Sequence, residues 1–582
     1  MSTVSEPNQL TSEEKIRKFN ELFETKMNRN FVLSNSVCVH CGMCVEACHY
    51  YEATKDPKNS PVYKSDAVRK IYKHRHDWLS RILPIWTGAR QVETQEDLDR
   101  LKDIAWGSCT MCRRCTINCP MGVDTALLIR SLRSVLNAIG DAPEGVKQVC
   151  RDQYEVGNQM GVSRQDYVET IEWLGEEHAD DVGDPAARIP LDKTGADVMY
   201  VVNPREVKYA PMTLLAVARI FYAAGENWTM PLEGWDNTNF GLFAGDDVLG
   251  GRMGRAMFEK AAQLGVKRVV VSECGHGFRA TRWESPNWAK MGLTFPIVSI
   301  LEVVEGYIRE GRIRLDKSLN PAPLTYHDPC NLARSCGLTE EPRFILRQCV
   351  ENFVEMYPNR ADNWCCSGGG GAMSMSEYTE RRLEVAKIKA DQLRATGAQI
   401  VATACHNCID ALTDLIKRYK LGMKTATVCE VAARALALPE KPKAAVPVRR
   451  PLEQAIGAGV KILVADDDRD ARTFIATVCE DNGAVVVQAR NGNEALELAR
   501  REMPDLITLD IDMPGKHGGE VYQALKDGSE LAKIPVCIIT GQPKLRGLIY
   551  DRPLPPPEGY LDKPTTDEEI LLAVRKILSL SH

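Results

Sequence analysis

The chain has 582 residues, enough for three or four domains, and its 44% apolar and 26% charged residues are typical of a globular protein. A formal net charge of −6 gives no reason to expect nucleic acid as a partner. The start, MSTVSEPNQL, has neither a basic region nor an apolar stretch, and no apolar run reaches membrane-spanning length. We therefore expect a cytoplasmic protein whose 20 cysteines serve metal rather than disulfides.

Residues 1–140 contain two copies of the spacing C-x-x-C-x-x-C-x-x-x-C, which is typical of ferredoxins with [4Fe–4S] clusters. In two-cluster ferredoxins the fourth cysteine of one motif binds the other cluster, so we expect two cubanes with exchanged ligands. Zinc is the alternative, but eight cysteines in this repeated spacing argue against it. The predicted ligand sets are Cys38, Cys41, Cys44 and Cys119 for one cubane, and Cys109, Cys112, Cys115 and Cys48 for the other.

The segment between the two motifs is too long for a compact β-hairpin ferredoxin and predicts helices at 65–74, 77–83 and 94–104. Thr11 and Glu14 form a predicted capping box at the start of an earlier helix, and 125–138 predicts a closing helix. The domain resembles the all-helical ferredoxins attached to respiratory reductases. Six apolar residues would pack in its core or meet a membrane partner: Trp78, Leu79, Ile82, Leu83, Ile85 and Trp86.

After a connector at 141–192, short β-branched strands alternate with helical stretches, which predicts α/β domains. An internal repeat runs through this region. TYHDPC at 325–330 aligns with YVVNPR at 200–205, and IVATACHNC at 400–408 aligns with VVVSECGHG at 269–277. We therefore expect one fold twice, at 193–308 and at 309–437.

The second copy carries five cysteines around a run of glycines, in the segments YHDPC, WCCSGGGGA and ACHNC. Thiolate is the soft ligand that iron–sulfur clusters require, and glycine permits close approach of the backbone. Buried structural cysteine is the alternative. The first copy keeps only Cys274, which cannot hold a cluster alone, so we expect no iron there. The five cysteines are Cys330, Cys365, Cys366, Cys405 and Cys408.

Residues 1–440 resemble the iron–sulfur catalytic subunit of membrane-bound heterodisulfide reductase, with its ferredoxin and cysteine-rich (CCG) domains. Related subunits occur in transmembrane redox complexes of sulfate- and sulfur-metabolising prokaryotes. The resemblance implies an unusual noncubane [4Fe–4S] cluster on the five cysteines, where a disulfide is cleaved reductively or formed in reverse. Ser367 stands where the family usually has glycine.

The same resemblance implies partners for this oxidoreductase. These are a haem- or quinone-binding membrane subunit, which would attach the chain to the inner face of the membrane, and a cytosolic thiol/disulfide protein or small disulfide. No G-x-G-x-x-G follows a strand in this region, so flavin or nicotinamide binding is unsupported. Candidates for proton delivery or a substrate-facing thiol are His327, His406, Cys336 and Cys274, and those for simple packing are Cys150, Cys349, Cys429, Cys479 and Cys537.

Two other functions fit these motifs. Lactate- and glycolate-oxidising systems contain subunits with ferredoxin and CCG domains that accept electrons from a flavoprotein, and such a subunit would relay electrons without touching a disulfide. Alternatively, the chain would be a redox-responsive signalling protein with the clusters as its sensor.

Residues 438–459 are rich in Pro, Ala and basic residues and predict a linker. Beyond it, at 460–582, predicted strands end in acidic or hydroxyl residues, which meet at one edge of a parallel sheet. Carboxylates there would form a hard oxygen site for Mg²⁺. Five prolines between residues 542 and 559 predict that one helix is short or absent.

This segment resembles the receiver domain of response regulators, which has a flavodoxin-like α/β fold. The resemblance implies Asp510 as phosphoacceptor and a histidine kinase as partner. A degenerate receiver that serves only for docking is the alternative. The other implied roles are Mg²⁺ binding by Asp466, Asp467 and the backbone carbonyl of Asp512, phosphoryl contacts by Thr540 and Lys563, and a switch aromatic at Tyr560.

Overall fold

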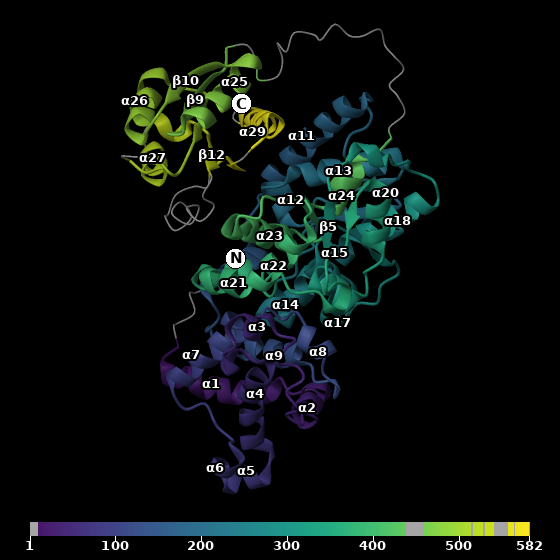
Figure 1. Cartoon of the computed structure of the whole chain (residues 1–582), viewed down its shortest axis with the longest axis vertical. Helices are drawn as coiled ribbons and strands as arrows, with labels where there is room; N and C mark the ends of the chain where they lie inside the picture. Colours follow the sequence, from purple (N-terminus) through teal and green to yellow (C-terminus); the bar gives the residue numbers. More distant parts are fainter. Residues whose placement is uncertain are drawn as a thin grey trace. The chain divides into compact units, whose positions relative to one another are not determined.

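The chain forms two compact units, Met1–Leu438 and Pro439–His582 (Figure 1). The linker predicted at 438–459 lies almost wholly outside the described residues, and so does most of the proline-rich segment in which a receiver helix is predicted to be short. The computed structural model describes residues 10–437, 456, 459–513, 516–527, 530–540, 557–563 and 565–580.

The regular elements of the N-terminal domain are all helices within its described residues, as predicted. Thr11 and Glu14 close the predicted capping box at the first helix. Buried aromatic side chains, among them Phe19, Phe23 and Trp106, pack with the apolar face of the closing helix. The helices are α1 (Ser12–Thr25), α2 (Arg29–Ser36), α3 (His49–Thr54), η1 (Pro57–Asn59), α4 (Pro61–His76), α5 (Trp78–Ile82), α6 (Pro84–Thr87), α7 (Gln95–Lys102), η2 (Asp103–Gly107), α8 (Arg114–Ile117) and α9 (Thr125–Ala138).

Two features differ from the predicted helices. α4 begins earlier than predicted because Ser60 caps it and Pro61 suits its first turn, where no backbone donor is needed. The apolar residues at 78–86 do not form core, so that alternative is wrong. They lie on α5 and α6, which are too short to bury a face and leave Ile85 and Trp86 93% and 88% exposed.

Two helices, α10 (Glu144–Glu155) and α11 (Arg164–Val182), connect this domain to two sheets of identical design. Both sheets are parallel, and their strand orders, β2-β1-β3-β4 and β6-β5-β7-β8, correspond strand for strand. This topology agrees with the predicted repeat. The strands are β1 (Val198–Val201), β2 (Trp228–Thr229), β3 (Arg268–Val271), β4 (Ile297–Ser299), β5 (Leu324–His327), β6 (Phe353–Val354), β7 (Ile400–Thr403) and β8 (Lys424–Ala426).

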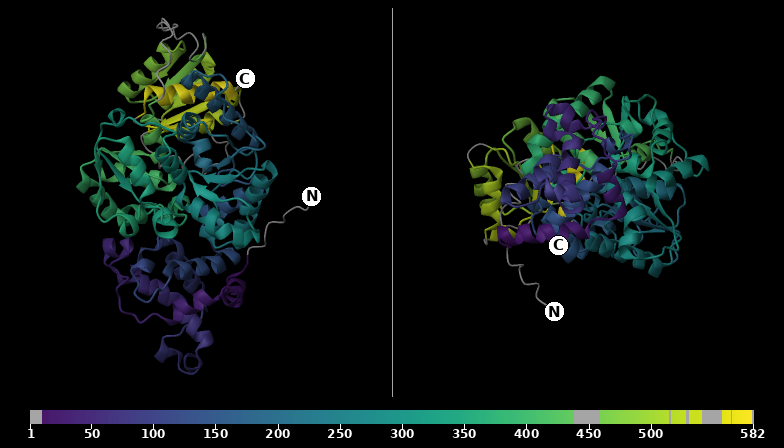
Figure 2. Two further views of the ribbon diagram at one scale, coloured as in Figure 1. Left: turned by 90° about the vertical axis from the view of Figure 1, so that its right-hand side faces the viewer. Right: turned by 90° about the horizontal axis from the view of Figure 1, so that it is seen from below.

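The two halves lie side by side and share one hydrophobic core, to which both sheets contribute (Figure 2). The central strands are buried along their length, because helices cover both faces of each parallel sheet. The helices of four or more residues are α12 (Pro204–Lys208), α13 (Pro211–Ala223), α14 (Gly241–Ala244), α15 (Asp247–Leu264), α16 (Gly275–Arg279), η3 (Ala280–Glu284), α17 (Ser285–Ala289), α18 (Ile300–Arg309), α19 (Cys330–Cys336), α20 (Glu341–Cys349), α21 (Thr379–Val385), α22 (Lys387–Thr396), α23 (His406–Tyr419) and α24 (Val428–Arg434).

The second unit is a five-stranded parallel sheet in the order β10-β9-β11-β12-β13, with helices on both faces. Alternate residues of β9 serve opposite cores, Leu463 on one side and Ile462 with Val464 on the other. Its elements are β9 (Lys461–Ala465), α25 (Arg469–Asp481), β10 (Val485–Ala489), α26 (Gly492–Glu502), β11 (Leu506–Leu509), α27 (Gly518–Lys526), β12 (Val536–Thr540), β13 (Gly559–Asp562) and α29 (Asp567–Leu580).

A buried ion pair stabilises the turn that follows β5. Arg343 of α20 is fully buried and donates two 2.7 Å hydrogen bonds to the carboxylate of Asp328. We predict that Arg343→Met lowers the free energy of unfolding by about 3–5 kcal/mol, because Asp328 would stay buried without its partner. Hydrogen exchange of the β5 amides measures this free energy within the multidomain chain.

Arg347 on the same helix provides the matched control. It is about half exposed and lies 3.7 Å from Glu355. Arg347→Met is expected to cost less than about 1 kcal/mol, because exposed ion pairs contribute little. Equal losses in the two variants would contradict the assignment of Arg343 to a buried stabilising pair.

Candidate functional site

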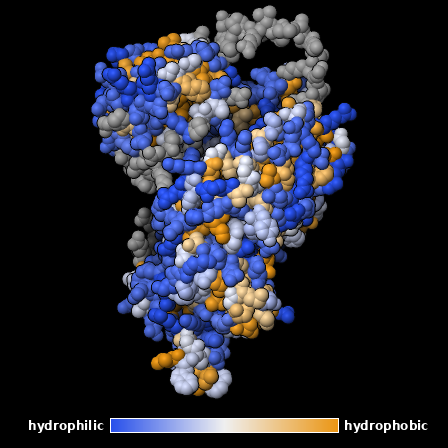
Figure 3. Space-filling model, in the orientation of Figure 1, coloured by the Kyte–Doolittle hydropathy of each residue, from blue (hydrophilic) through white to orange (hydrophobic). Residues whose placement is uncertain are grey.

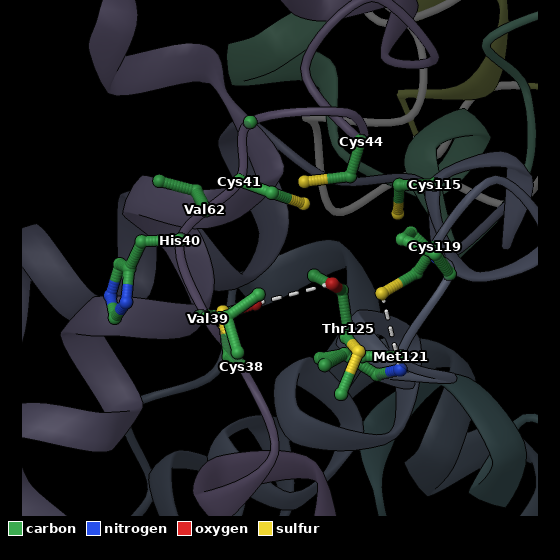
Figure 4. A pocket seen from close by; sticks show the side chains of 14 residues that line it. Cys38, Val39, His40, Cys41, Cys44, Val62, Cys115, Cys119, Met121 and Thr125 are labelled. Carbon is green, nitrogen blue, oxygen red and sulfur yellow. Dashed lines mark hydrogen bonds between the residues drawn. The ribbon is translucent and has the colours of Figure 1, made fainter.

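The ferredoxin cysteines gather around two adjacent cavities. Cys38, Cys41, Cys44 and Cys119 line the first, here called the outer site (Figure 4). Figure 4 shows the sulfurs of Cys41, Cys44 and Cys119 directed into the same space. Burial, and then the nearby Cys119, raises the pKa of Cys44 to about 11. A soft cation removes this penalty by binding the thiolates, so the donor set fits iron. Cys41 is exposed, so the outer site opens to the surface.

The second cavity, the inner site, is lined by Cys48, Cys109, Cys112 and Cys115. Cys115 also lines the outer site, so the two sites are immediate neighbours. Lys64 is buried beside the inner site, and its Nζ donates to the sulfur of Cys48 at 3.5 Å. A buried ammonium next to four cysteines favours a group of net negative charge at this position.

Five further cysteines meet at the carboxyl edge of the second sheet, here called the five-cysteine site. β5 and β7 are paired neighbours, so the turns after them come together. Cys330 opens α19, Cys405 caps α23, and Cys408 lies in the first turn of α23. The pair Cys365–Cys366 approaches from a loop, and the sulfurs of Cys366 and Cys408 are 3.3 Å apart. All five cysteines are buried and free, which suits a large thiolate-bound cluster.

The backbone after the cysteine pair is held close to its neighbours. Ser367 has φ of +66°, a left-handed conformation that favours glycine, so serine here costs about 1–2 kcal/mol. Gly370 has φ of +67°, and a Cβ there would lie 2.7 Å from the carbonyl oxygen of Thr110. The glycine run therefore allows this loop to contact the ferredoxin domain.

The inner site and the five-cysteine site are in direct contact. Ligand atoms of His49, Cys112 and Cys365 all lie within 4.8 Å of one another. The hydroxyl of Thr110 lies 3.5 Å from the sulfur of Cys365. His49 was not among the residues predicted from the motifs, although its position directly after Cys48 was the available signal. This contact makes one continuous series of three cysteine sites.

Arg133 of α9 joins the domains at this point. Its fully buried guanidinium donates to the carbonyl oxygens of Ala105 and Cys109, each at 2.8 Å. It also donates to the carbonyl oxygen of Phe243 in the first half, at 3.1 Å, and to the carbonyl oxygen of Gly370 in the second half, at 2.6 Å. Burial lowers the pKa of Arg133 to about 10, so it remains charged at neutral pH.

A hydrogen-bonded chain orients His327 beside the five-cysteine site. Burial lowers the pKa of Lys389 to about 7, and its Nζ donates to Oδ1 of Asn363 at 2.6 Å. This leaves the Asn363 amide nitrogen, 3.1 Å from His327 Nδ1, to donate to that atom. His327 therefore carries its proton on Nε2. A ring nitrogen of His327 lies within 4.8 Å of the sulfurs of Cys366 and Cys408. Since Nδ1 is occupied by Asn363, the arrangement presents an N–H donor to these sulfurs.

Residues of the first half line one side of the five-cysteine site. Cys274 is buried, and its sulfur lies 3.4 Å from Nδ1 of His276. Hydrogen bonding from Cys408, and then from His276, lowers the pKa of Cys405 in spite of its burial. His406 instead faces the buried carboxylate of Glu206 at 3.4 Å, which raises its pKa against the effect of burial.

The remaining cysteines named from the sequence are not among the predicted ligands of the three cysteine sites. Cys336 ends α19, and burial raises its pKa to about 12. The five cysteines predicted to serve packing are all buried: Cys150, Cys349, Cys429, Cys479 and Cys537.

The predicted receiver residues lie at the carboxyl ends of adjacent strands. Carboxylate oxygens of Asp466, Asp467 and Asp510 lie within 4.8 Å of one another, which fits a hard divalent cation. Lys563 contacts both Asp466, at 2.6 Å, and Asp510. Burial raises the pKa of Asp466 to about 6, as expected for clustered acids. The backbone nitrogen of Asp512 donates to Asp510, and the last residue of β12, Thr540, is buried at the same edge.

Three family models match separate parts of the chain. Residues 34–123 match a 4Fe-4S dicluster domain, residues 324–413 a cysteine-rich (CCG) domain, and residues 462–575 a response regulator receiver domain. Within the described residues, no helix is long and apolar enough to cross a bilayer.

Similar proteins extend beyond these domains. An Hdr-like menaquinol oxidoreductase iron–sulfur subunit of Archaeoglobus fulgidus is 29% identical, over 72% of this chain and 82% of its own. One subunit of the dihydromethanophenazine:CoB–CoM heterodisulfide reductase of Methanosarcina mazei is 28% identical, over 69% of this chain and 94% of its own. A Francisella receiver domain of known structure is 28% identical over 21% of this chain and 98% of its own, with a TM-score of 0.19.

The Archaeoglobus and Methanosarcina relatives are named as subunits of oxidoreductases, and they match 72% and 69% of this chain. The receiver match lies within the second unit. The chain is therefore a homologue of the Hdr-like iron–sulfur subunits, built from ferredoxin and CCG domains with a response regulator receiver domain.

Proposed function

We propose that this oxidoreductase subunit passes electrons between a haem- or quinone-binding membrane subunit and a thiol/disulfide substrate. The substrate is a small disulfide or a cytosolic protein, and the reaction takes place at the five-cysteine site. The single observation that carries this proposal is the contact of Cys112 with Cys365 beside His49. It makes the inner site adjacent to the site where a disulfide would react, so electrons can arrive there one at a time.

The proposed cofactors are two cubane [4Fe–4S] clusters, at the outer and inner sites, and one noncubane [4Fe–4S] cluster at the five-cysteine site. When bound, they supply one-electron carriers and an iron that has affinity for sulfur. The chain's own residues supply the rest. Arg133 keeps the inner-site loop against the glycine run, and His327 directs an N–H toward the sulfurs of Cys366 and Cys408.

The outer site is the proposed point of electron exchange with the membrane partner. Cys41 is exposed, and apolar residues of the same loops surround it. Val39, Met43 and Met121 are 63%, 62% and 46% exposed. Exposed apolar side chains around a redox site suit docking of another protein, because their burial stabilises a complex without fixed charge pairs.

One relative supports a second partner class. A protein of Syntrophomonas wolfei named EtfAB:quinone oxidoreductase is 23% identical over 69% of this chain and 58% of its own length. Its name favours an electron relay between a flavoprotein and quinone. In that case, the five-cysteine site would exchange electrons without binding a disulfide. The two partner classes are distinguished by whether the chain co-purifies with a flavoprotein or with a haem protein.

For the receiver domain we propose phosphorylation of Asp510 by a histidine kinase. Asp466 and Asp467 would bind Mg²⁺, with the backbone carbonyl of Asp512, and Lys563 would neutralise the phosphoryl group. The chain would then be a cytoplasmic subunit, held at the membrane through its partners and controlled by phosphorylation.

Iron content tests the cluster assignment. We predict that the anaerobically purified chain binds iron equal to three four-iron clusters and gives an additional EPR signal in the thiol-oxidised state. Cys366→Ser should lose that signal and one cluster of iron, because it removes a thiolate. Cys349→Ala, a buried cysteine of α20, is the control and should keep all iron. Iron for two clusters in the wild type would contradict the proposal.

The reduction potential tests the role of His327. An N–H donor stabilises the more negative, reduced form, so its loss should lower the potential of the noncubane signal. We predict that Lys389→Met lowers the midpoint in an EPR-monitored titration, because Asn363 loses the partner that orients it. Lys387→Met, on the exposed face of the same helix, should leave it unchanged. Equal midpoints at full iron content would refute the role of this chain of hydrogen bonds.

Phosphorylation tests the receiver assignment. We predict that acetyl phosphate with Mg²⁺ adds one phosphoryl group to the full chain, detected as a mass increase of the intact protein, and that removal of Mg²⁺ abolishes it. Asp510→Asn should abolish the modification, whereas Asp481→Asn at the exposed end of α25 should retain it. Modification that persists in Asp510→Asn would show that another residue is the acceptor.

A further inference from the structure

A short helical projection of the ferredoxin domain exposes apolar side chains to solvent. It consists of residues 78–86, which include α5 and α6, and is here called the apolar tip (Figure 1). Figure 3 shows hydrophobic side chains gathered at this end of the domain. Four residues of the apolar tip are exposed by 66% or more: Trp78 at 72%, Ile82 at 66%, Ile85 at 93% and Trp86 at 88%.

Capping residues define the helices of the apolar tip despite this exposure. Asp77 caps α5 and accepts from Leu79 and Ser80, at 3.2 and 2.6 Å. Pro84 begins α6, and Gly88 closes it with φ of +66°. Caps at both ends indicate a defined element rather than a loop that happens to carry apolar residues. Leaving this much apolar surface in water is unfavourable, so a partner that covers it is expected.

The surroundings of the apolar tip are basic. Between residues 67 and 92 the only acidic residue is Asp77, which is engaged in the cap of α5. Arg75 and Arg90 pair with Glu24 and Asp97. Lys70, Lys73 and Arg81 have no acidic partner among the ion pairs of the described N-terminal domain. The chain as a whole has a net charge of −6, so this cationic region is a local feature.

The shape of the apolar tip distinguishes a lipid layer from a protein groove. A groove receives one face of a helix, with apolar residues at every third or fourth position. Here the apolar residues lie on two short helices separated at Leu83, so they do not form one continuous helix face. All six are 39% or more exposed: Trp78, Leu79, Ile82, Leu83, Ile85 and Trp86. A fluid lipid layer covers every side of a small projection. Tryptophan with flanking lysine and arginine is also the composition favoured at membrane interfaces.

We propose that the apolar tip inserts into the interfacial layer of a membrane that contains anionic lipids, with Lys70, Lys73 and Arg81 near the headgroups. The chain would then contact lipid itself, in addition to any membrane subunit of the proposed function. Insertion without a membrane-spanning segment gives reversible binding that depends on both apolar area and anionic charge. The inference does not depend on which substrate the five-cysteine site takes.

Vesicle sedimentation tests this proposal with the full, iron-loaded chain. We expect binding to phosphatidylcholine vesicles that contain phosphatidylglycerol, and weaker binding at high salt or without the anionic lipid. The double substitution Ile85→Ser with Trp86→Ser should weaken binding by about tenfold or more, because two inserted side chains are lost. The control is Val248→Ser, at an apolar residue of α15 that is 76% exposed and lies outside the apolar tip, and this variant should bind like the wild type.

A charge variant tests the second element of the proposal. Lys70→Gln, Lys73→Gln and Arg81→Gln together should remove most of the preference for phosphatidylglycerol and most of the salt dependence. Lys387→Gln, at an exposed lysine outside the apolar tip, is the control and should leave both the lipid preference and the salt dependence unchanged. Absence of wild-type binding to either vesicle, or equal binding by the apolar-tip double variant, would overturn the proposal. A protein groove would be favoured, and the proposal overturned, if the wild type bound no vesicles but bound a purified membrane subunit, and the apolar-tip double variant lost that binding.

Discussion

The structure of the first unit, Met1–Leu438, depends on one buried guanidinium. Arg133 donates to carbonyl oxygens of the ferredoxin domain and of both halves of the duplicated α/β region. A buried charge is costly unless all its donors are satisfied, so these carbonyls must stay in place together. Because Cys109 and Gly370 are two of these partners, the same interaction sets the spacing between the inner site and the five-cysteine site.

The duplicated fold places residues of the first half beside the cysteines of the second half. The sheet of the first half has the same strand order as its partner, and the turn after β3 brings Cys274 and His276 against Cys405. Equivalent turns of the two sheets face each other. The turn of the first half therefore lies beside the cysteines of the second half and contributes hydrogen-bonding side chains there. In the proposed function the second half binds the cluster, and Cys274 and His276 of the first half line one side of its site.

Much of the fold followed from periodicity and repeated motifs. The predicted helical ferredoxin, the repeated α/β sheets and the receiver topology are confirmed, because each has a local pattern of apolar residues, turns and caps. Three features were not predictable in this way. These are the exposure of Trp86, the left-handed conformation of Ser367 and the contact of His49 with Cys365, none of which follows from apolar periodicity or motif spacing.

The sequence alone determined which side chains could bind metal or phosphate, because cysteine spacing and strand-end acids are local patterns. Only the tertiary structure decided which of them meet. The contact of Cys112 with Cys365 joins residues 253 positions apart (365 − 112). The chain Lys389–Asn363–His327 likewise joins a helix, a loop and a strand. Such contacts arise from packing of whole domains, where buried polar groups must find partners, and no local spacing encodes that requirement.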